Sequence, residues 1–251
     1  MAIDPRNAGR DALIAWAVVA GLVAGLVQIN ITLPAIGHLG SALVAVVFLY
    51  TPVLAAWHRR EHLDDYAFHA EPVGKGLVTA GAAIAVIFPV FVLGYFAFYE
   101  IACNSSLLSH LVPRNMCSHY GGLSSLHLPQ VTWMSHAGAS FSVEFCLVQL
   151  IVVALPEELF FRGFLLGLLE ERFPPKRRIL GGGVGLALVI SAAAFALIHL
   201  PKDGDPRALA TFFPGLLFGW MRSSTKSILA STVTHAGSNI LVRVLDLMVQ
   251  R

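Results

Sequence analysis

Charged residues are scarce in this chain, and their scarcity excludes most soluble fold classes. Only 13% of the 251 residues are charged, whereas 56% are hydrophobic, and the mean hydropathy is +0.72. Soluble domains average about 25% charged residues. The net charge is only +2, and no basic stripe with interleaved aromatic residues occurs, so nucleic acid is not expected as a partner. The composition predicts a multi-pass membrane protein that lies in the lipid bilayer.

Cysteine is rare, and the glycine motifs of nucleotide-binding proteins are missing. Three cysteines cannot form a disulfide framework, and Cys-x-x-Cys does not occur. No Walker or dinucleotide-binding pattern is present, and Gly181, Gly182 and Gly183 are interpreted as helix packing or the loose start of a helix. Cys103 and Cys117 share one polar loop, where a bridge between them and two free thiols both remain open.

Long apolar runs predict an all-α fold, because runs of about 18 or more apolar residues are typical of transmembrane helices. We expect about seven helices around a polar cavity at mid-membrane depth, with no long-period repeat. The expected spans are residues 12–32, 41–57, 73–99, 139–172, 179–200, 208–221 and 227–249. The fourth span is longer than a bilayer core, so it is expected to bend or emerge, with Pro156 as the natural break.

Lysine and arginine are distributed unevenly between the two sets of loops. Eleven fall on the side of the N-terminus and four on the opposite side. The first set is Arg6, Arg10, Arg59, Arg60, Lys75, Arg172, Lys176, Arg177, Arg178, Arg222 and Lys226, and the second is Arg114, Lys202, Arg207 and Arg251. Cytoplasmic loops carry the excess of positive charge, so the N-terminus is predicted to be cytoplasmic and the 100–138 loop non-cytoplasmic. We expect a cell-membrane location, in the inner membrane of a bacterium.

The 100–138 loop carries four of the ten histidines, His110, His119, His127 and His136. Their spacings of nine, eight and nine residues place no two of them on one helical face. We therefore predict no metal site in this loop. Its mixed apolar content fits a segment that lies in the membrane interface, over the outer mouth of the expected cavity.

The run from Leu155 to Gly163 holds two adjacent carboxylates and an arginine within apolar sequence. Ionisable side chains at membrane depth are costly and usually functional. In a helix, Glu158 and Arg162 are four residues apart and share a face, so we expect a structural ion pair. Glu157 points about 100° away and is expected to face a cavity. The alternative is an ion-pair knot that only locks helices together.

Two further polar sites lie in apolar context. His199 ends the fifth expected span, and His235 and Asn239 share a face of the seventh. A carboxylate and an imidazole can activate water, and an imidazole and an amide can stabilise an oxyanion. Together these residues favour a hydrolase without a serine or cysteine nucleophile. Taken singly, His199 suits an interfacial side chain, and the His235 and Asn239 pair suits interhelical hydrogen bonding.

These motifs resemble those of the CPBP family of intramembrane glutamic proteases, which includes type II CAAX prenyl endopeptidases and bacteriocin-processing, Abi-type proteins. Family members carry Glu-Glu-x-x-x-Arg, Phe-x-x-x-His and His-x-x-x-Asn or Asp, in this order. The matching residues are Glu157, Glu158, Arg162, Phe195, His199, His235 and Asn239. The resemblance covers about residues 141–241. We therefore expect a catalytic helical core in residues 139–251, and transmembrane helices with a long loop in residues 1–138.

The resemblance implies an endopeptidase that cuts near the membrane-anchored or lipidated end of a protein or peptide. Glu157 and His199 would activate the water that attacks the peptide carbonyl. His235 and Asn239 would stabilise the oxyanion. The neighbouring ion pair would hold the fourth helix in register, with no metal or other cofactor.

Two alternatives remain open. Glu157 and the two histidines would also suit zinc, although the metalloprotease pattern His-Glu-x-x-His is absent. A catalytically silent immunity protein or peptide-binding scaffold of the same family would keep the fold without hydrolysis. A transporter would predict inverted repeats or paired broken helices, and the sequence shows neither.

Overall fold

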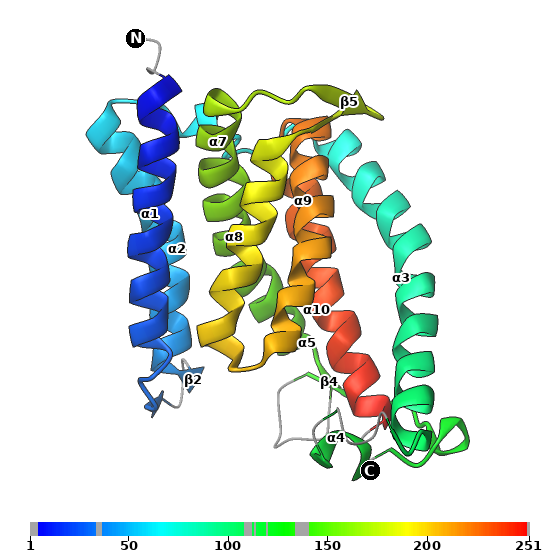
Figure 1. Cartoon of the computed structure of the whole chain (residues 1–251). Coiled ribbons are helices and arrows are strands. Elements are labelled where there is room, and N and C mark those ends of the chain that lie inside the picture. The colour runs from blue at the N-terminus through cyan, green and yellow to red at the C-terminus, as the bar shows by residue number, and fades with distance from the viewer. Residues whose placement is uncertain are drawn as a thin grey trace. The chain divides into compact units, whose positions relative to one another are not determined.

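The structure, a computed structural model, describes residues 5–33, 37–107, 112, 114–118, 120–133 and 141–249. These residues are mostly helical (Figure 1). The α-helices are α1 (Pro5–Leu26), α2 (Leu39–Arg59), α3 (Val73–Asn104), α4 (Arg114–Ser118), α5 (Val143–Val148), α6 (Leu155–Glu158), α7 (Leu166–Arg172), α8 (Leu186–Asp203), α9 (Phe212–Thr225) and α10 (Leu229–Val249). Two π-helical segments are η4 (Gln149–Ala154) and η5 (Leu159–Leu165). The 3-10 helices are η1 (Leu63–Tyr66), η3 (Leu123–Ser125) and η6 (Pro206–Thr211).

Strands are short and form three pairs among the described residues. β1 (Thr32–Leu33) and β2 (Gly37–His38) are antiparallel, as are β5 (Arg177–Ile179) and β6 (Gly182–Val184). β3 (Val131–Thr132) and β4 (Phe141–Ser142) are parallel. Each strand has only two or three residues, so the described residues are mainly helical, as the apolar runs predict.

Three helices are long and apolar enough to cross a membrane in the part of the chain that the structure describes. They are Asn7–Leu26, Leu39–Arg59 and Val73–Asn104, and Leu186–Lys202 is a shorter apolar helix. These helices indicate a multi-pass membrane protein. The expectation of seven spans remains a prediction, because α9 has only 14 residues, about 21 Å of helix, against about 30 Å of hydrocarbon.

Contacts divide the chain into two compact units. The first unit contains Met1–Ala80 and Leu150–His235, and the second contains Gly81–Gln149 and Ala236–Arg251. These units are defined by contacts and each combines two separate segments of the chain, whereas the sequence predicted one boundary between residues 138 and 139. That boundary remains a prediction.

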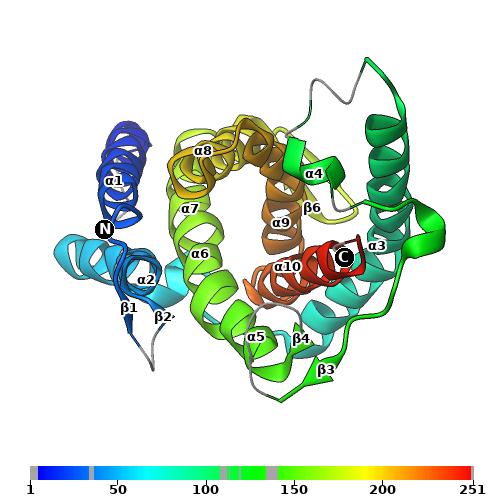
Figure 2. The same cartoon turned by 90° about the horizontal axis from the view of Figure 1, so that it is seen from below.

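The first unit is built around an apolar helical core. α8 packs against α9 and α7, and α1 packs against α2 and α7 (Figure 2). Phe48 of α2 meets Phe160 and Phe161 of η5, with ring centroids 5.6 Å apart in both pairs. Residues 159–166 are all buried, as expected of a helix surrounded by other helices. The acidic motif therefore enters the most enclosed part of this unit.

The second unit is tied together at the end of α3. Cys103 and Cys117 form a disulfide, which resolves the choice that the sequence left open. The Tyr120 hydroxyl donates to Glu100 at 2.6 Å, and the Tyr95 hydroxyl donates to Asp246 of α10 at 2.5 Å. The described part of the long loop is thus attached to α3 by a covalent bond and a hydrogen bond.

The fifth span differs from its prediction at both ends. Helix α8 begins at Leu186, and the β5–β6 hairpin occupies the residues before it. Leu180 and Gly181 have φ angles of 48° and 83°, in the left-handed region that glycine adopts without strain. The triple glycine therefore allows a tight turn and does not start a helix. At the other end, α8 continues through Pro201 to Asp203.

Candidate active site

The two adjacent glutamates lie on α6, a single helical turn between two π-helical segments. Pro156 occupies the first turn of α6 and has no backbone N–H to donate. Segments of π-helix are uncommon and often occur at functional sites. The predicted break near Pro156 therefore takes the form of altered helical winding, and it presents Glu157 and Glu158 to different neighbours.

Glu158 and Arg162 form a buried ion pair. Arg162 Nη1 lies 3.0 Å from Glu158 Oε1, and the two side chains are 1% and 0% exposed. The contact is an ion pair without hydrogen-bond alignment. The guanidinium also lies 4.0 Å from the centre of the Phe195 ring and donates to the Gly215 carbonyl at 3.5 Å. Burying two charges is costly, and these added contacts offset part of that cost.

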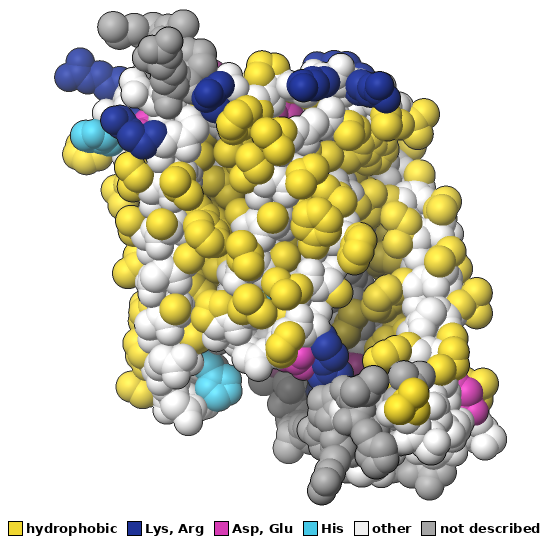
Figure 3. Space-filling view, viewed as in Figure 1, with side chains coloured by type: hydrophobic (Ala, Val, Ile, Leu, Met, Phe, Trp, Pro, Cys, Tyr) yellow, Lys and Arg dark blue, Asp and Glu magenta, His cyan; other side chains and the backbone are white. Residues whose placement is uncertain are grey.

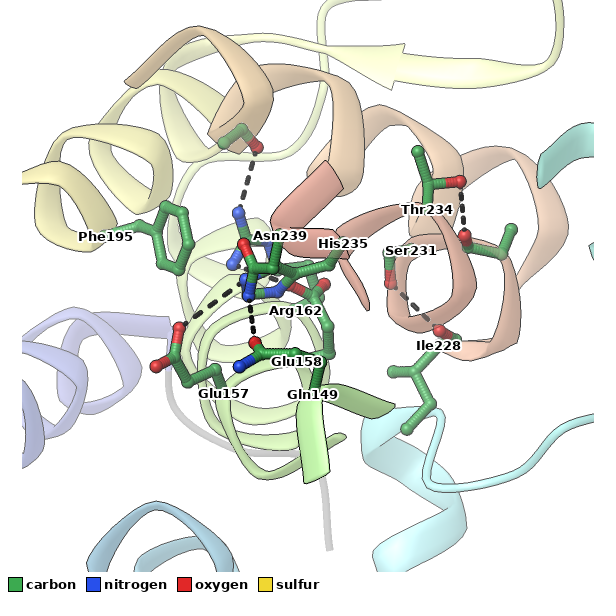
Figure 4. Close-up of polar contacts among 12 residues, drawn as sticks. Gln149, Glu157, Glu158, Arg162, Phe195, Ile228, Ser231, Thr234, His235 and Asn239 are labelled. Atoms are coloured by element: carbon green, nitrogen blue, oxygen red, sulfur yellow. Dashed lines mark hydrogen bonds and ion pairs between the residues drawn. The ribbon is translucent and has the colours of Figure 1, made fainter. Parts of the chain in front are cut away.

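His235 is held by the same carboxylate. Its Nδ1 lies 2.9 Å from Glu158 Oε1 (Figure 4). A carboxylate accepts, so Nδ1 carries a proton, and Nε2 of the neutral ring is the basic nitrogen. Phe218 stacks on the imidazole at 5.1 Å, and Phe195 meets it edge-on at 5.7 Å. These contacts fix both the tautomer and the ring plane of His235.

Glu157 is buried and lies between a cation and an imidazole. Its Oε1 accepts a hydrogen bond from Lys202 Nζ at 2.7 Å, and its Oε2 lies 3.8 Å from His235 Nε2. Oε2 accepts no hydrogen bond within the described residues. An oxygen atom about 2.8 Å from both Oε2 and Nε2 fits the normal hydrogen-bond range. Glu157 Oε2 is almost completely buried, so a water molecule reaches this position only if neighbouring side chains move.

His199 is oriented by its own helix. Its Nδ1 lies 2.7 Å from the carbonyl oxygen of Phe195, one turn earlier in α8, and the residue is 8% exposed. Because a carbonyl only accepts, Nδ1 donates and Nε2 is again the basic nitrogen of the neutral ring. His199 is close enough to Glu157 for an electrostatic interaction, and its role in activating water remains a prediction.

Asn239 belongs to the second unit. There its side-chain amide donates to Gln149 Oε1 at 2.9 Å (Figure 4). This contact fixes which end of the carboxamide faces Gln149. The role of Asn239 toward an oxyanion remains a prediction.

Three partners of the predicted site residues were not predicted from the sequence: Lys202, Phe218 and Gln149. Lys202 follows His199 by three residues, a spacing that shares a helix face, but Pro201 suggested that the helix had already ended. Phe218 lies in an apolar run with no local signal of its partner, whereas Gln149 is the only polar side chain between Phe145 and Leu155. The spacing of Lys202 and the isolated polarity of Gln149 could both have been used.

The described residues contain no group of three or more His, Cys, Asp or Glu side chains arranged to hold a metal ion. Nε2, the nitrogen that metals often bind, nevertheless makes no hydrogen bond to the orienting partner in either His199 or His235, because Nδ1 makes that contact in both. His110, His119 and His136 of the long loop lie outside the described residues. The zinc alternative therefore requires a direct test of metal content and of activity after chelation.

Comparison with known proteins identifies one family. Residues 139–241 match the family model described as type II CAAX prenyl endopeptidase Rce1-like. No curated protein and no solved structure matches the chain. The matched segment contains all three motifs, which confirms the resemblance that they suggested. Residues 139–241 of this chain are thus an Rce1-like domain of the type II CAAX prenyl endopeptidase (CPBP) family.

Proposed function

We propose that the protein is an intramembrane endopeptidase that cleaves a peptide bond near the membrane-anchored or lipidated end of its substrate. One observation carries this proposal. The buried Glu157 Oε2 lies 3.8 Å from His235 Nε2, a separation that one water molecule admitted to the site would bridge with hydrogen bonds of normal length. Membership in a protease family supports the same reading.

The reaction follows from these positions. Glu157 accepts a proton from the water, and the hydroxide attacks the carbonyl carbon of the peptide bond. The carbonyl oxygen becomes an oxyanion, which by family resemblance accepts a hydrogen bond from Asn239, and His235 can donate to it from Nε2 only when the ring is an imidazolium. Collapse of this intermediate breaks the C–N bond, and the leaving amine takes the proton from Glu157. The products are one carboxylic acid and one amine.

His199 has a supporting role in this scheme. Its Nδ1–H bond to the Phe195 carbonyl directs the ring, and its Nε2 can hold the water for Glu157. The buried Glu158 keeps His235 in the tautomer whose Nε2 faces Glu157. Arg162 neutralises Glu158, so one ion pair both stabilises the core and positions a reacting group.

An apolar cavity in the first unit supports a substrate that carries a hydrocarbon chain. The cavity measures about 350 Å³, and its lining includes Trp16, Leu165, Ile190 and Leu197. Leu197 lies two residues before His199 on α8, about 200° around the helix, so the cavity lies on the face of α8 away from His199 and would hold a lipid chain beside the site and not within it. A Leu197→Trp change should narrow the cavity and raise KM for a prenylated peptide, while KM for the same peptide without the lipid should change little.

The direct test uses purified protein in lipid nanodiscs and fluorescent peptides with and without a C-terminal prenyl group. Glu157→Gln should lower the cleavage rate by roughly 10²- to 10⁴-fold, the range of general-base catalysis. Glu171→Gln is the matched control, because Glu171 is exposed on the next helix and should retain activity. Substantial turnover by Glu157→Gln would overturn the glutamate mechanism.

One observation favours a second candidate. Glu157 is ion-paired with Lys202, an arrangement that also suits a scaffold which binds peptides without cutting them. Such a protein would bind the peptide in the nanodisc assay but release it uncut. A comparison of membrane proteomes from wild-type and Glu157→Gln cells would then show no uncut precursors.

A further inference from the structure

The β5–β6 hairpin combines basic and apolar side chains at one end of the first unit. Its register pairs Arg177 with Val184 and Ile179 with Gly182, and the turn between the strands is Leu180–Gly181. Lys176, Arg177 and Arg178 are exposed, and no acidic residue occurs between Pro174 and Gly185. Figure 3 shows lysine and arginine side chains gathered at this end, where Figure 1 places β5.

The tip of the hairpin is the most exposed apolar part of this segment. Leu180 is 87% exposed and Ile179 is 55% exposed. Both φ angles in the turn are positive, as in the tight turns that match the twist of a hairpin. Such a turn holds Leu180 outward. Two large aliphatic side chains in water carry a cost that contact with hydrocarbon would remove.

The hairpin is attached to α9 on both sides of its turn. Trp220 Nε1 donates to the Ile179 carbonyl at 2.7 Å, and the Gly183 N–H donates to Ser223 Oγ at 2.8 Å. A Cβ at Gly182 would lie 2.3 Å from the Trp220 ring, so only glycine fits this approach. The hairpin is therefore held at a defined position and does not trail as a loose loop.

Its place in the chain puts the hairpin at a membrane surface. The apolar helix Leu186–Lys202 begins two residues after β6. A segment at the entrance of a membrane helix meets the headgroup layer, where phosphates attract cations and acyl chains accept apolar side chains. The basic residues 176–178 form the stem of the hairpin and the aliphatic residues 179–180 form its tip. This order suits a hairpin whose stem lies at the phosphates and whose tip reaches the acyl chains.

We propose that the β5–β6 hairpin is a bilayer-interface anchor, in which Lys176, Arg177 and Arg178 bind anionic phospholipid headgroups and Ile179 and Leu180 enter the acyl boundary. The anchor fixes the depth of α8 and α9, which carry His199 and Phe218. The proposal uses none of the residues assigned to hydrolysis. Its failure would leave the proposed function unchanged.

The first test measures the surroundings of the tip. An environment-sensitive fluorophore is attached to Leu180→Cys in a Cys146→Ser background, where the remaining cysteines are joined in the disulfide. In nanodiscs, we expect blue-shifted emission that spin-labelled lipids quench. The same fluorophore at Asp64→Cys, an exposed position of η1, is the water-like control. Water-like, unquenched emission at residue 180 would overturn the anchor.

The second test measures the charge on the stem. Protein is placed in nanodiscs of phosphatidylcholine with added phosphatidylglycerol, and the bound anionic lipid is measured. The Lys176→Gln/Arg177→Gln/Arg178→Gln variant should bind it on the order of a hundredfold more weakly at low salt, and the difference should shrink as salt screens the charges. The matched Arg10→Gln/Arg60→Gln/Lys226→Gln variant removes three exposed charges elsewhere in the unit and should lose less of its binding to anionic lipid.

An equal loss of lipid binding in both variants would show that the charges act without a specific site. Tip fluorescence that shifts only with an added acidic protein would show a protein partner instead; either result overturns the proposal.

Discussion

Lys202 places its ammonium 2.7 Å from the carboxylate of Glu157, so the buried acid at the centre of the site is already paired with a cation from another helix. The Lys202 side chain is 30% exposed, whereas that of Glu157 is 4% exposed. Lys202 therefore connects the enclosed carboxylate with more open surroundings. Together with Arg162 opposite Glu158, it balances the two negative charges that α6 brings into the core.

The first prediction concerns this cation. Lys202→Met should lower the cleavage rate about tenfold or more, because removing one partner of a buried pair leaves an uncompensated charge. Lys202→Arg should retain most of the activity, since it keeps the charge. The measurement is kcat and KM for both variants in nanodiscs. A Lys202→Met protein that cleaves faster than wild type would mean that Lys202 restrains Glu157 and does not support it.

The second prediction separates stability from catalysis at Arg162. Arg162→Ala leaves Glu158 buried without its cation, which should cost about 3–5 kcal/mol of folding stability. The measurement is the midpoint of thermal unfolding and the yield after purification. Arg207→Ala is the control, because its ion pair with Asp205 is exposed and should be worth at most about 1 kcal/mol. An Arg162→Ala protein of normal yield and midpoint but no activity would contradict the structural role.

Local spacing made part of this site predictable. Glu158 and Arg162 share a helix face whatever the rest of the chain does, so their i,i+4 spacing in apolar sequence was sufficient. The contact between His235 and Glu158 joins residues 77 positions apart, and no local pattern carries it. Glu157 was expected to face a cavity, but its ion pair with Lys202 could not be expected from a sequence in which Pro201 marked the end of a helix.

The β5–β6 hairpin was missed for a related reason. Three glycines within an apolar run are compatible with close helix packing and with a tight turn. The turn prevails because Trp220, some forty residues later, lies where any larger residue at Gly182 would clash. A contact between residues so far apart in sequence cannot be predicted from the composition of the segment that contains the three glycines.

The third prediction concerns Gln149 and Asn239. Gln149→Leu removes the acceptor that orients the Asn239 carboxamide, so activity should fall toward that of Asn239→Ala. Gln149→Glu keeps an acceptor at the same position and should restore part of the rate. The midpoint of unfolding is measured alongside, because a general loss of packing would lower it in both variants. Full activity in Gln149→Leu would show that this contact does not support catalysis.

The fourth prediction separates the glutamate mechanism from the zinc alternative. Cleavage should survive exhaustive dialysis against a strong chelator, because the proposed steps use only Glu157, the two histidines and water. Elemental analysis of the dialysed protein is the accompanying measurement. Loss of activity that added zinc restores would overturn the scheme and assign Glu157, His199 and His235 to a metal.

The last prediction concerns the orientation of the chain in the membrane. The Cys103–Cys117 disulfide forms at the end of α3, and disulfides persist in oxidising compartments. Lysine and arginine are more frequent in the loops expected on the other side of the membrane, which predicts that those loops face the cytoplasm. In intact cells, a membrane-impermeant thiol reagent should therefore label Leu126→Cys, near η3, but not Lys226→Cys, the exposed residue that directly follows α9. Both variants carry Cys146→Ser, and inverted vesicles should reverse the pattern. If only Lys226→Cys is labelled in intact cells, the N-terminus is outside, the disulfide cannot be maintained by an oxidising compartment, and both arguments for this orientation fail together.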